Sequence, residues 1–356
     1  MTFDLQSLVR RNIRNLKPYS SARSEFEGSA DVFLDANENA FGSPAGSGLN
    51  RYPDPLQREL KDRIAAIKGV SPSQIFVGNG SDEAIDLLFR IFCEPGSDEV
   101  ITCPPTYGMY RVSADINDVA VREIRLTDDF QLNVPAILSA IAGATKLIFI
   151  CSPNNPTGNL MSRESVLEIS RRFTGIVVVD EAYIDFADEP SLIAELDSLP
   201  NLVVLQTFSK AWGMAGVRVG LAFARTEIID LMNRVKPPYN VSGLAQQAVI
   251  DALDSESIIT KWITTGKKER KFLEGSLSAL SIVQKIYPSD ANFLLVKVDD
   301  PRSTYRYLIE EKIVVRDRSN VELCDGCLRI TVGTSDENRR LVSALSKFCD
   351  RREKNS

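Results

Sequence analysis

Apolar runs of strand length alternate with amphipathic stretches between about residue 56 and residue 255. The apolar runs predict strands at 74–77, 99–103, 146–151, 175–179, 202–207 and 217–224. The stretches between them predict helices at 56–67, 82–93, 163–172 and 190–196. Uniformly apolar strands that alternate with helices are typical of an α/β fold, in which helices cover both faces of a mostly parallel sheet. Such sheets hold their ligands beyond the carboxyl ends of the strands.

The pattern changes after residue 255 and predicts a smaller α+β domain. Its expected helices cover 261–280, 304–312 and 336–348, and its expected strands cover 292–298, 313–316 and 327–332. We therefore divide the chain into an N-terminal segment at 1–40 that packs on the small domain, a large domain at 41–255 and a small C-terminal domain at 256–356. Residues 42–55 are rich in Gly and Pro and predict a loop or an arm. Residues 350–356 are expected to fray.

Composition narrows the classes of partner. The chain has 356 residues, enough for two domains, and its 44% hydrophobic content is ordinary for a globular protein. Its net charge of −6 argues against nucleic acids and anionic membranes as partners. No apolar run approaches the about 18 residues of a membrane span, and the N-terminus lacks the pattern of a secretory signal. We expect a cytoplasmic location.

Histidine is absent from the sequence. Its absence excludes Ser-His-Asp and Cys-His catalysis and zinc sites of the His-Glu-x-x-His type. Acid–base chemistry then falls to Lys, Tyr, Cys, a carboxylate or a cofactor. The six cysteines are scattered, and Cys324 and Cys327 form the only Cys-x-x-Cys pair. Without a second pair we expect two ordinary thiols beside a turn, and no metal site.

Two turns that follow expected strands present groups suited to a bound ligand. Gly78, Gly80 and Ser81 lead into the helix at 82–93, so free backbone amides would face a phosphate at a helix N-terminus. The third Gly of a dinucleotide site is replaced by Glu83, which argues against NAD. Residues 152–158 hold two prolines and two asparagines, which fix a rigid turn. Taken singly, each segment also fits a plain structural turn.

Two further strand ends carry ionisable groups. Asp180 directly follows four apolar β-strand residues, and Tyr183 lies three positions later. A carboxylate that is partly desolvated at this position needs a cationic partner. Lys210 follows the strand at 202–207, with Ser209 beside it and Arg218 eight residues later. Such a lysine could be a Schiff-base nucleophile or a solvated surface residue.

The combination is more specific than its parts. Pyridoxal phosphate needs an amine for its aldehyde, a carboxylate for its ring nitrogen, hydrogen-bond donors for its ring hydroxyl oxygen, and amides and Arg for its phosphate. The expected strand ends of one sheet supply all of these groups.

The same segments resemble the fold-type I pyridoxal-phosphate enzymes of the aspartate aminotransferase superfamily, and within them the histidinol-phosphate aminotransferase branch. The resemblance covers nearly the whole chain. The segments that carry it are 34–39, 51–55, 104–110, the Asn-Pro-Thr-Gly turn at 155–158, Asp-Glu-Ala-Tyr at 180–183, Ser-Lys at 209–210 with Arg218, and 328–333.

The resemblance implies roles toward pyridoxal 5′-phosphate. Lys210 would bond the cofactor and move the reaction's proton, with its amine pKa lowered by the cofactor and by Arg218. Asp180 would pair with the ring nitrogen. The remaining implied contacts are Tyr183 and Asn155 on the ring hydroxyl oxygen, Tyr107 on the ring face, and the amides of Ser81 and Asp82 with Ser209 and Arg218 on the phosphate.

The resemblance also implies the substrates, a phosphorylated amine and a 2-oxo acid. Arg329 would bind the α-carboxylate of glutamate and 2-oxoglutarate, and Tyr19 and Arg316 would bind the phosphate of L-histidinol phosphate. Tyr52 would reach the cofactor of a partner subunit, which implies a homodimer with shared sites. Two other activities fit the same scaffold: threonine-phosphate decarboxylation and broad aromatic transamination. A non-catalytic regulator would need an added DNA-binding domain, for which the chain has no room.

Overall fold

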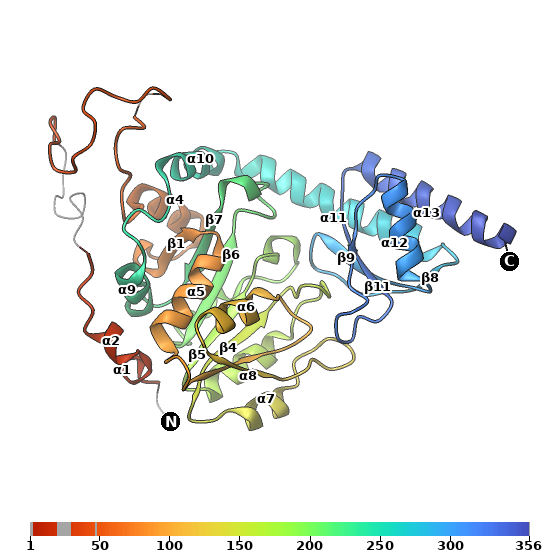
Figure 1. Ribbon diagram of the computed structural model, residues 1–356, viewed down its shortest axis with the longest axis horizontal. Coiled ribbons are helices and arrows are strands. Elements are labelled where there is room, and N and C mark those ends of the chain that lie inside the picture. The colour runs from red at the N-terminus through yellow and green to blue at the C-terminus, as the bar shows by residue number, and fades with distance from the viewer. Residues whose placement is uncertain (1–2, 20–29, 47, 356) are drawn as a thin grey trace.

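The computed structural model describes residues 3–19, 30–46 and 48–355, and Figure 1 shows a large unit and a small unit side by side. The large unit is built on a seven-stranded sheet in the order β1-β7-β6-β5-β4-β2-β3. β7 is antiparallel to both its neighbours, and the other neighbouring strands are parallel. The strands are β1 (Ile75–Asn79), β2 (Glu99–Thr102), β3 (Ala120–Glu123), β4 (Thr145–Cys151), β5 (Ile176–Asp180), β6 (Leu202–Thr207) and β7 (Val219–Phe223).

Helices cover both faces of this sheet, so the predicted α/β fold is confirmed. One face packs against α4 (Arg58–Lys68), α7 (Val134–Ala140), α8 (Arg163–Arg172) and α10 (Gly243–Leu253). The other packs against α5 (Ser81–Phe92), α6 (Met109–Ile116) and α9 (Thr226–Val235). Four short 3-10 helices complete the unit: η1 (Pro72–Gln74), η2 (Ile184–Phe186), η3 (Leu192–Glu195) and η4 (Ala215–Val217).

Helix α5 shows why the pattern was informative. Ile85, Leu88, Phe89 and Phe92 recur at helical spacing, and all four are fully buried against the sheet. Burial of each such side chain stabilises the fold by about 1.5–3 kcal/mol. The helix is therefore fixed along its whole length, and its N-terminus is held beside the end of β1.

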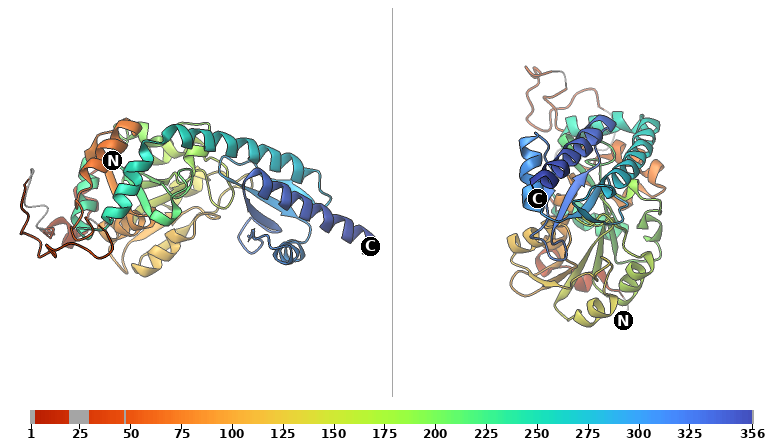
Figure 2. Two further views of the ribbon diagram at one scale, coloured as in Figure 1. Left: turned by 90° about the horizontal axis from the view of Figure 1, so that it is seen from above. Right: turned by 90° about the vertical axis from the view of Figure 1, so that its right-hand side faces the viewer.

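The small unit is an antiparallel sheet covered by helices. Its strands β8 (Val283–Ile286), β9 (Phe293–Val298), β10 (Arg316–Asp317) and β11 (Cys327–Thr331) pair in the order β10-β11-β9-β8. Its helices are α11 (Glu256–Ser278), α12 (Pro301–Glu310) and α13 (Ser335–Asn355). The long helix α11 runs from the large unit to the small one (Figures 1 and 2), contacting η2 in the former and β8 and α13 in the latter.

Two terminal segments differ from expectation. The prediction that the N-terminal segment packs on the small domain is wrong for residues 3–16. These form α1 (Leu5–Leu8) and α2 (Arg11–Arg14), and Val9 and Ile13 are buried in the large unit's core with α5. At the other end, residues 350–355 continue α13 rather than fray. No helix of the described part of the chain is long and apolar enough to cross a membrane.

Candidate active site

A cavity of about 650 Å³ lies at the carboxyl ends of the parallel strands and is closed on one side by the small unit. All the candidate residues except Tyr19 and Tyr52 line it: Ser81, Asp82, Tyr107, Asn155, Asp180, Tyr183, Ser209, Lys210, Arg218, Arg316 and Arg329. Strand ends β1, β4, β5 and β6 supply most of these side chains, as expected for a parallel sheet. β10 and β11 supply the last two.

The segment at 78–83 forms a cup between β1 and α5. The cup is joined to the loop before β7, because the backbone N–H of Gly80 donates to the carbonyl oxygen of Arg218 at 2.8 Å. Gly80 has φ +75°, and a Cβ there would lie 2.7 Å from an Arg218 nitrogen, so the chain needs glycine at this position. A Cβ on Gly220, in the neighbouring strand β7, would clash with the backbone nitrogen of Ser81. Both glycines therefore keep the first amides of α5 open toward the cavity.

Arg218 and Ser209 lie on the opposite wall of this cup. Nη1 of Arg218 donates to the Ser209 hydroxyl at 3.4 Å, and the Arg218 side chain lies 3.6 Å from the Asp82 carboxylate. Arg218 itself has φ +59°, a left-handed conformation that costs a non-glycine residue energy. Amides at a helix N-terminus, a hydroxyl and a guanidinium together make a site for a phosphate.

Asp180 is a buried carboxylate at the end of β5. Its Oδ2 accepts a 2.8 Å hydrogen bond from the Tyr110 hydroxyl, and its Oδ1 accepts one from the backbone N–H of Ala182 at 3.1 Å. Burial raises the pKa of Asp180 to about 6, although both hydrogen bonds act in the opposite direction. Among the described residues no Lys or Arg pairs with Asp180 directly. The site would therefore favour a protonated nitrogen as its ligand.

Lys210 lies across the same space, with Nζ 5.4 Å from the centre of the Tyr183 ring. Partial burial lowers the pKa of the Lys210 amine, and the positive charge of Arg329 acts in the same direction. Arg218 also lowers this pKa, as expected, although burial and Arg329 have larger effects. A lysine with a lowered pKa is a suitable nucleophile and proton carrier.

Asn155 links the turn after β4 to the small unit. Its side-chain oxygen accepts a hydrogen bond from Arg329 of β11, and its amide nitrogen, which has no partner among the described residues, can donate to a ligand in the cavity. Arg329 also lies over the Phe293 ring, with 5.3 Å between the guanidinium carbon and the ring centre. These contacts hold Arg329 at the point where the two units meet.

Two residues of the cavity region were not predicted. Tyr110 is fully buried; it lies in the segment 104–110 that carries the family resemblance, but nothing in the sequence assigned it a role. Arg318 lines the cavity beside Arg316. It lies two residues beyond the predicted strand at 313–316, so no sequence pattern indicated that it shares a face with Arg316.

Tyr107, Tyr19 and Tyr52 are placed differently from one another. Tyr107 lines the cavity, and its hydroxyl donates to Asp82 at 3.1 Å. Tyr52 lies on the Gly- and Pro-rich arm, is 51% exposed and stacks on Tyr239 with 4.5 Å between ring centres. Tyr19 is 77% exposed and does not line the cavity of this single chain. The roles inferred for Tyr19 and Tyr52 remain predictions.

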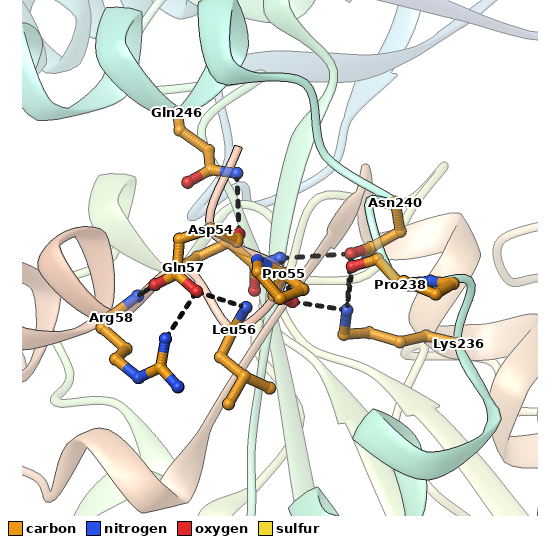
Figure 3. Close-up of polar contacts among 9 residues, drawn as sticks. All are labelled: Asp54, Pro55, Leu56, Gln57, Arg58, Lys236, Pro238, Asn240 and Gln246. Carbon is orange, nitrogen blue, oxygen red and sulfur yellow. Dashed lines mark hydrogen bonds and ion pairs between the residues drawn. The ribbon is translucent and has the colours of Figure 1, made fainter. Parts of the chain in front are cut away.

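The root of the arm is tied to the phosphate cup through Lys236 and Asn240, and Figure 3 shows the contacts of these two residues with the root of the arm. The Lys236 ammonium donates to the carbonyl oxygens of Pro55 at 2.7 Å and Pro238 at 3.0 Å, and to the Asn240 side chain at 3.1 Å. The Asn240 amide in turn donates to Glu83 at 3.0 Å. Glu83 accepts the backbone N–H of Asn79 in the cup. One network of hydrogen bonds therefore joins the arm to the cup.

The arrangement fits pyridoxal phosphate. The glycines that leave the cup open, the Lys210 amine and the buried carboxylate of Asp180 match its phosphate, its aldehyde and its ring nitrogen. Cys151 also lines the cavity, but burial raises the pKa of its thiol far above neutral, so it is no competing nucleophile. Cys324 and Cys327 are free thiols in the core, as expected of ordinary thiols.

Comparison with known proteins agrees with this interpretation. Residues 25–345 match the family model "Aminotransferase class I and II". The histidinol-phosphate aminotransferases of Cytophaga hutchinsonii and Bacteroides fragilis are 54% and 52% identical to this chain, over 98% and 97% of it and over 100% and 99% of their own lengths. The crystal structure of the histidinol-phosphate aminotransferase from Clostridium acetobutylicum superposes with a TM-score of 0.79 at 25% identity, covering 85% of this chain and 92% of that one.

The matches extend over both units and include every segment that forms the cavity. The chain therefore belongs to the class I and II aminotransferases and, within them, to the histidinol-phosphate aminotransferases.

Proposed function

We propose that this chain is a pyridoxal-phosphate-dependent aminotransferase that converts L-histidinol phosphate and 2-oxoglutarate to imidazole acetol phosphate and L-glutamate in histidine biosynthesis. The observation that carries the proposal is a single cavity that holds Lys210, the buried Asp180 and the guanidinium groups of Arg316 and Arg329. The first two fit the cofactor. The arginines fit substrates that carry carboxylate and phosphate groups.

When bound, pyridoxal 5′-phosphate supplies an electrophilic carbon for the substrate amine and a ring that accepts the electrons released at the α-carbon. The cup amides of Ser81 and Asp82, with Ser209 and Arg218, would hold its phosphate. The Asp180 carboxylate would keep the ring nitrogen protonated, since burial makes an ionised Asp180 costly unless a cation lies beside it. Asn155 and Tyr183 would donate to the ring hydroxyl oxygen.

Lys210 would carry the proton of the reaction. Its Nζ needs to be neutral to accept a proton from the substrate's α-carbon, and both burial and Arg329 favour the neutral amine. Lys210 would then deliver this proton to the carbon of the bound cofactor that takes over the amino group. No imidazole is needed for this transfer, which accords with a sequence that has no histidine.

Arg329 would orient the α-carboxylate of glutamate. It meets Asn155 and Phe293 at the boundary of the two units, so its guanidinium is held before the substrate arrives. Arg316 would bind the far end of either substrate, the phosphate or the second carboxylate. Bidentate contacts from arginine suit both groups.

We further propose that two copies of the chain share their active sites. Tyr52 on the arm is half-exposed, and Phe41 and Leu34 in the segment before it are fully and 86% exposed, which supports packing of this part of the chain on a second copy. Tyr52 would then reach the cofactor phosphate of the partner. The cytoplasmic location inferred from the sequence is likewise a proposal.

The shared site is tested by mixing two inactive variants, Lys210→Ala and Tyr52→Ala. After denaturation and refolding together, about a quarter of wild-type activity should return, because half the dimers are hybrids that each carry one intact site. Sedimentation should give a dimer. Recovery of no activity beyond the sum of the two separate variants would contradict shared sites.

The reaction is tested by incubating the holoenzyme with 2-oxoglutarate and L-histidinol phosphate and measuring glutamate. L-phenylalanine replaces histidinol phosphate in a second assay, and CO₂ release from threonine phosphate is measured in a third. We expect glutamate formation to be fastest with histidinol phosphate, with no CO₂. CO₂ release without amino transfer would instead identify a threonine-phosphate decarboxylase, and equal rates with phenylalanine a broad aromatic enzyme.

The lysine assignment is tested with Lys210→Ala and a matched control. The control is Lys261→Ala, which removes an exposed lysine from α11. We expect Lys210→Ala to lose activity and the visible absorbance of the lysine-bound cofactor, and Lys261→Ala to keep both. Full activity in Lys210→Ala would overturn the site assignment.

A further inference from the structure

Three arginines occupy one face of the small unit's sheet where it closes the cavity. Arg316 of β10 pairs directly with Arg329 of β11, so both side chains point to the same face. Arg318 follows two residues after Arg316, and its backbone N–H donates to the Cys327 carbonyl oxygen at 2.9 Å, which continues the pairing. All three residues line the cavity.

The positive charges of this arginine cluster (Arg316, Arg318 and Arg329) are not neutralised by acidic side chains of the described residues. Within the described ranges none of the three forms an ion pair with a carboxylate. Burial and the charges of Arg329 and Arg316 lower the pKa of Arg318, the direction expected where like charges gather. A protein of net charge −6 thus concentrates positive charge at one wall of its site. Such a wall favours an anionic ligand.

Arg318 has an unmet hydrogen-bonding group. Its Nε is buried and has no hydrogen-bond partner in the described part of the chain, whereas Arg329 donates to Asn155. A buried donor without a partner costs free energy that a ligand acceptor can recover. The loop that carries Arg318 is fixed, because the next residue, Ser319, donates through both its backbone N–H (2.8 Å) and its hydroxyl to Asp317.

The two substrates of the proposed reaction differ in the number and geometry of the hydrogen-bond acceptors that they present to this cluster. A dicarboxylate such as glutamate presents two planar carboxylates, and one arginine fork satisfies each. Arg329 and Arg316 therefore suffice for it. A phosphate monoester carries nearly two charges and three terminal oxygens in a tetrahedral arrangement, more acceptors than one planar fork can meet.

We infer that Arg318 is a specificity-determining residue that binds the terminal phosphate of the phosphorylated amine together with Arg316 and contributes little to binding of the dicarboxylate substrate. This inference rests on the proposed function and adds a residue that the family resemblance did not supply. The guanidinium of Arg318 would therefore let the site distinguish a phosphate from a carboxylate bound at the same position.

The test compares two anions on the cofactor-loaded enzyme. Inorganic phosphate reports on the substrate position, because the cofactor's own phosphate fills the cup. Glutarate serves as the dicarboxylate probe. The dissociation constants of both are measured by calorimetry for the wild type, for Arg318→Gln and Arg318→Lys, and for the control Arg306→Gln, which removes an equal charge from an exposed position on α12.

We expect Arg318→Gln to weaken phosphate binding about 10- to 100-fold and glutarate binding less than about threefold, because a hydrogen bond to a charged group is lost. Arg318→Lys keeps the charge but not the fork and should fall between. Arg306→Gln should bind both anions as the wild type does. In turnover, KM for histidinol phosphate should rise in Arg318→Gln while KM for glutamate stays nearly unchanged.

An equal loss for both anions would mean that Arg318 only shapes the cavity, and unchanged phosphate binding would mean that it has no part in it; either result overturns the inference. Should Arg318→Gln fail to fold, wild-type phosphate binding by Arg318→Lys would overturn it as well. If histidinol phosphate proves not to be a substrate, the proposed function fails, but the comparison of phosphate with glutarate still decides the role of Arg318.

Discussion

The hydroxyl of Tyr110 donates a 2.8 Å hydrogen bond to the carboxylate of Asp180, and both side chains are buried beneath the cavity. Tyr110 lies on α6 and Asp180 at the end of β5, so the bond joins a helix of the large unit to the end of a sheet strand. It also stabilises the ionised carboxylate, since the hydrogen bond lowers the pKa that burial raises. Tyr110 is thus a positioning residue for Asp180.

Removing this hydroxyl should weaken cofactor binding. In Tyr110→Phe the Asp180 carboxylate loses one of its two donors, so its ionised form and its orientation toward a ring nitrogen are both less favoured. We expect cofactor affinity to fall about tenfold, in line with one hydrogen bond to a charged group. Titration of the apoprotein with pyridoxal phosphate, followed by absorbance, measures it. Tyr307→Phe is the matched control, because Tyr307 is a buried tyrosine in the core of the small unit and does not line the cavity. Equal affinities in both variants would contradict the role of Tyr110.

The stability of the apoprotein should depend on pH through Asp180. The folded protein holds this proton up to about pH 6, whereas the unfolded chain releases it near the ordinary aspartate pKa of 3.8. Between these values the folded state binds more protons, so the free energy of unfolding falls as pH rises. Relative to Asp180→Asn, the loss should reach about 2.4 kcal/mol between pH 4 and pH 7. Urea denaturation of both proteins across this range measures it. A difference that does not change with pH would contradict the raised pKa.

Gly220 should be irreplaceable for the cup. A Cβ at this position meets the backbone of Ser81 and Gly80, which cannot move without displacing the N-terminus of α5. We expect Gly220→Ala to lower cofactor affinity by more than about tenfold, because the phosphate amides are misplaced. Gly216→Ala is the control, since a Cβ on Gly216 meets nothing within 4 Å among the described residues. Cofactor titration of the two purified variants distinguishes them, and tight binding by Gly220→Ala would show that the cup tolerates the shift.

The sequence pattern located the residues of the site that follow strands, because a parallel sheet brings all its carboxyl ends to one edge. Asp180 ends β5 and Lys210 lies three residues beyond the end of β6. These two strands pair directly, so the closeness of the two residues depended only on the strands being neighbours. The apolar runs indicated those strands to within one or two residues.

Contacts made across long stretches of sequence were beyond such reasoning. Tyr110 and Asp180 are 70 residues apart, and nothing local to either marks the bond. Arg318 required the pairing of β10 with β11, and β10 is only two residues long. The N-terminal segment was misplaced for a similar reason: its apolar residues, among them Phe3, Leu5, Leu8, Val9 and Ile13, do not show from the sequence which surface they cover.

Lys236 should couple the arm to the cup. Its ammonium donates to the carbonyl oxygens of Pro55 and Pro238 and to the side chain of Asn240. The Asn240 amide in turn donates to Glu83. In Lys236→Met the carbonyl oxygen of Pro238 loses its donor and Asn240 loses one partner, so we expect about 2 kcal/mol lower stability. Cofactor affinity should fall as well, since Glu83 holds the Asn79 amide of the cup. Lys261→Met, on the exposed face of α11, controls for loss of a lysine charge. Urea denaturation and cofactor titration measure the two effects. A loss of stability with unchanged cofactor affinity would contradict the coupling of the arm to the cup through Lys236.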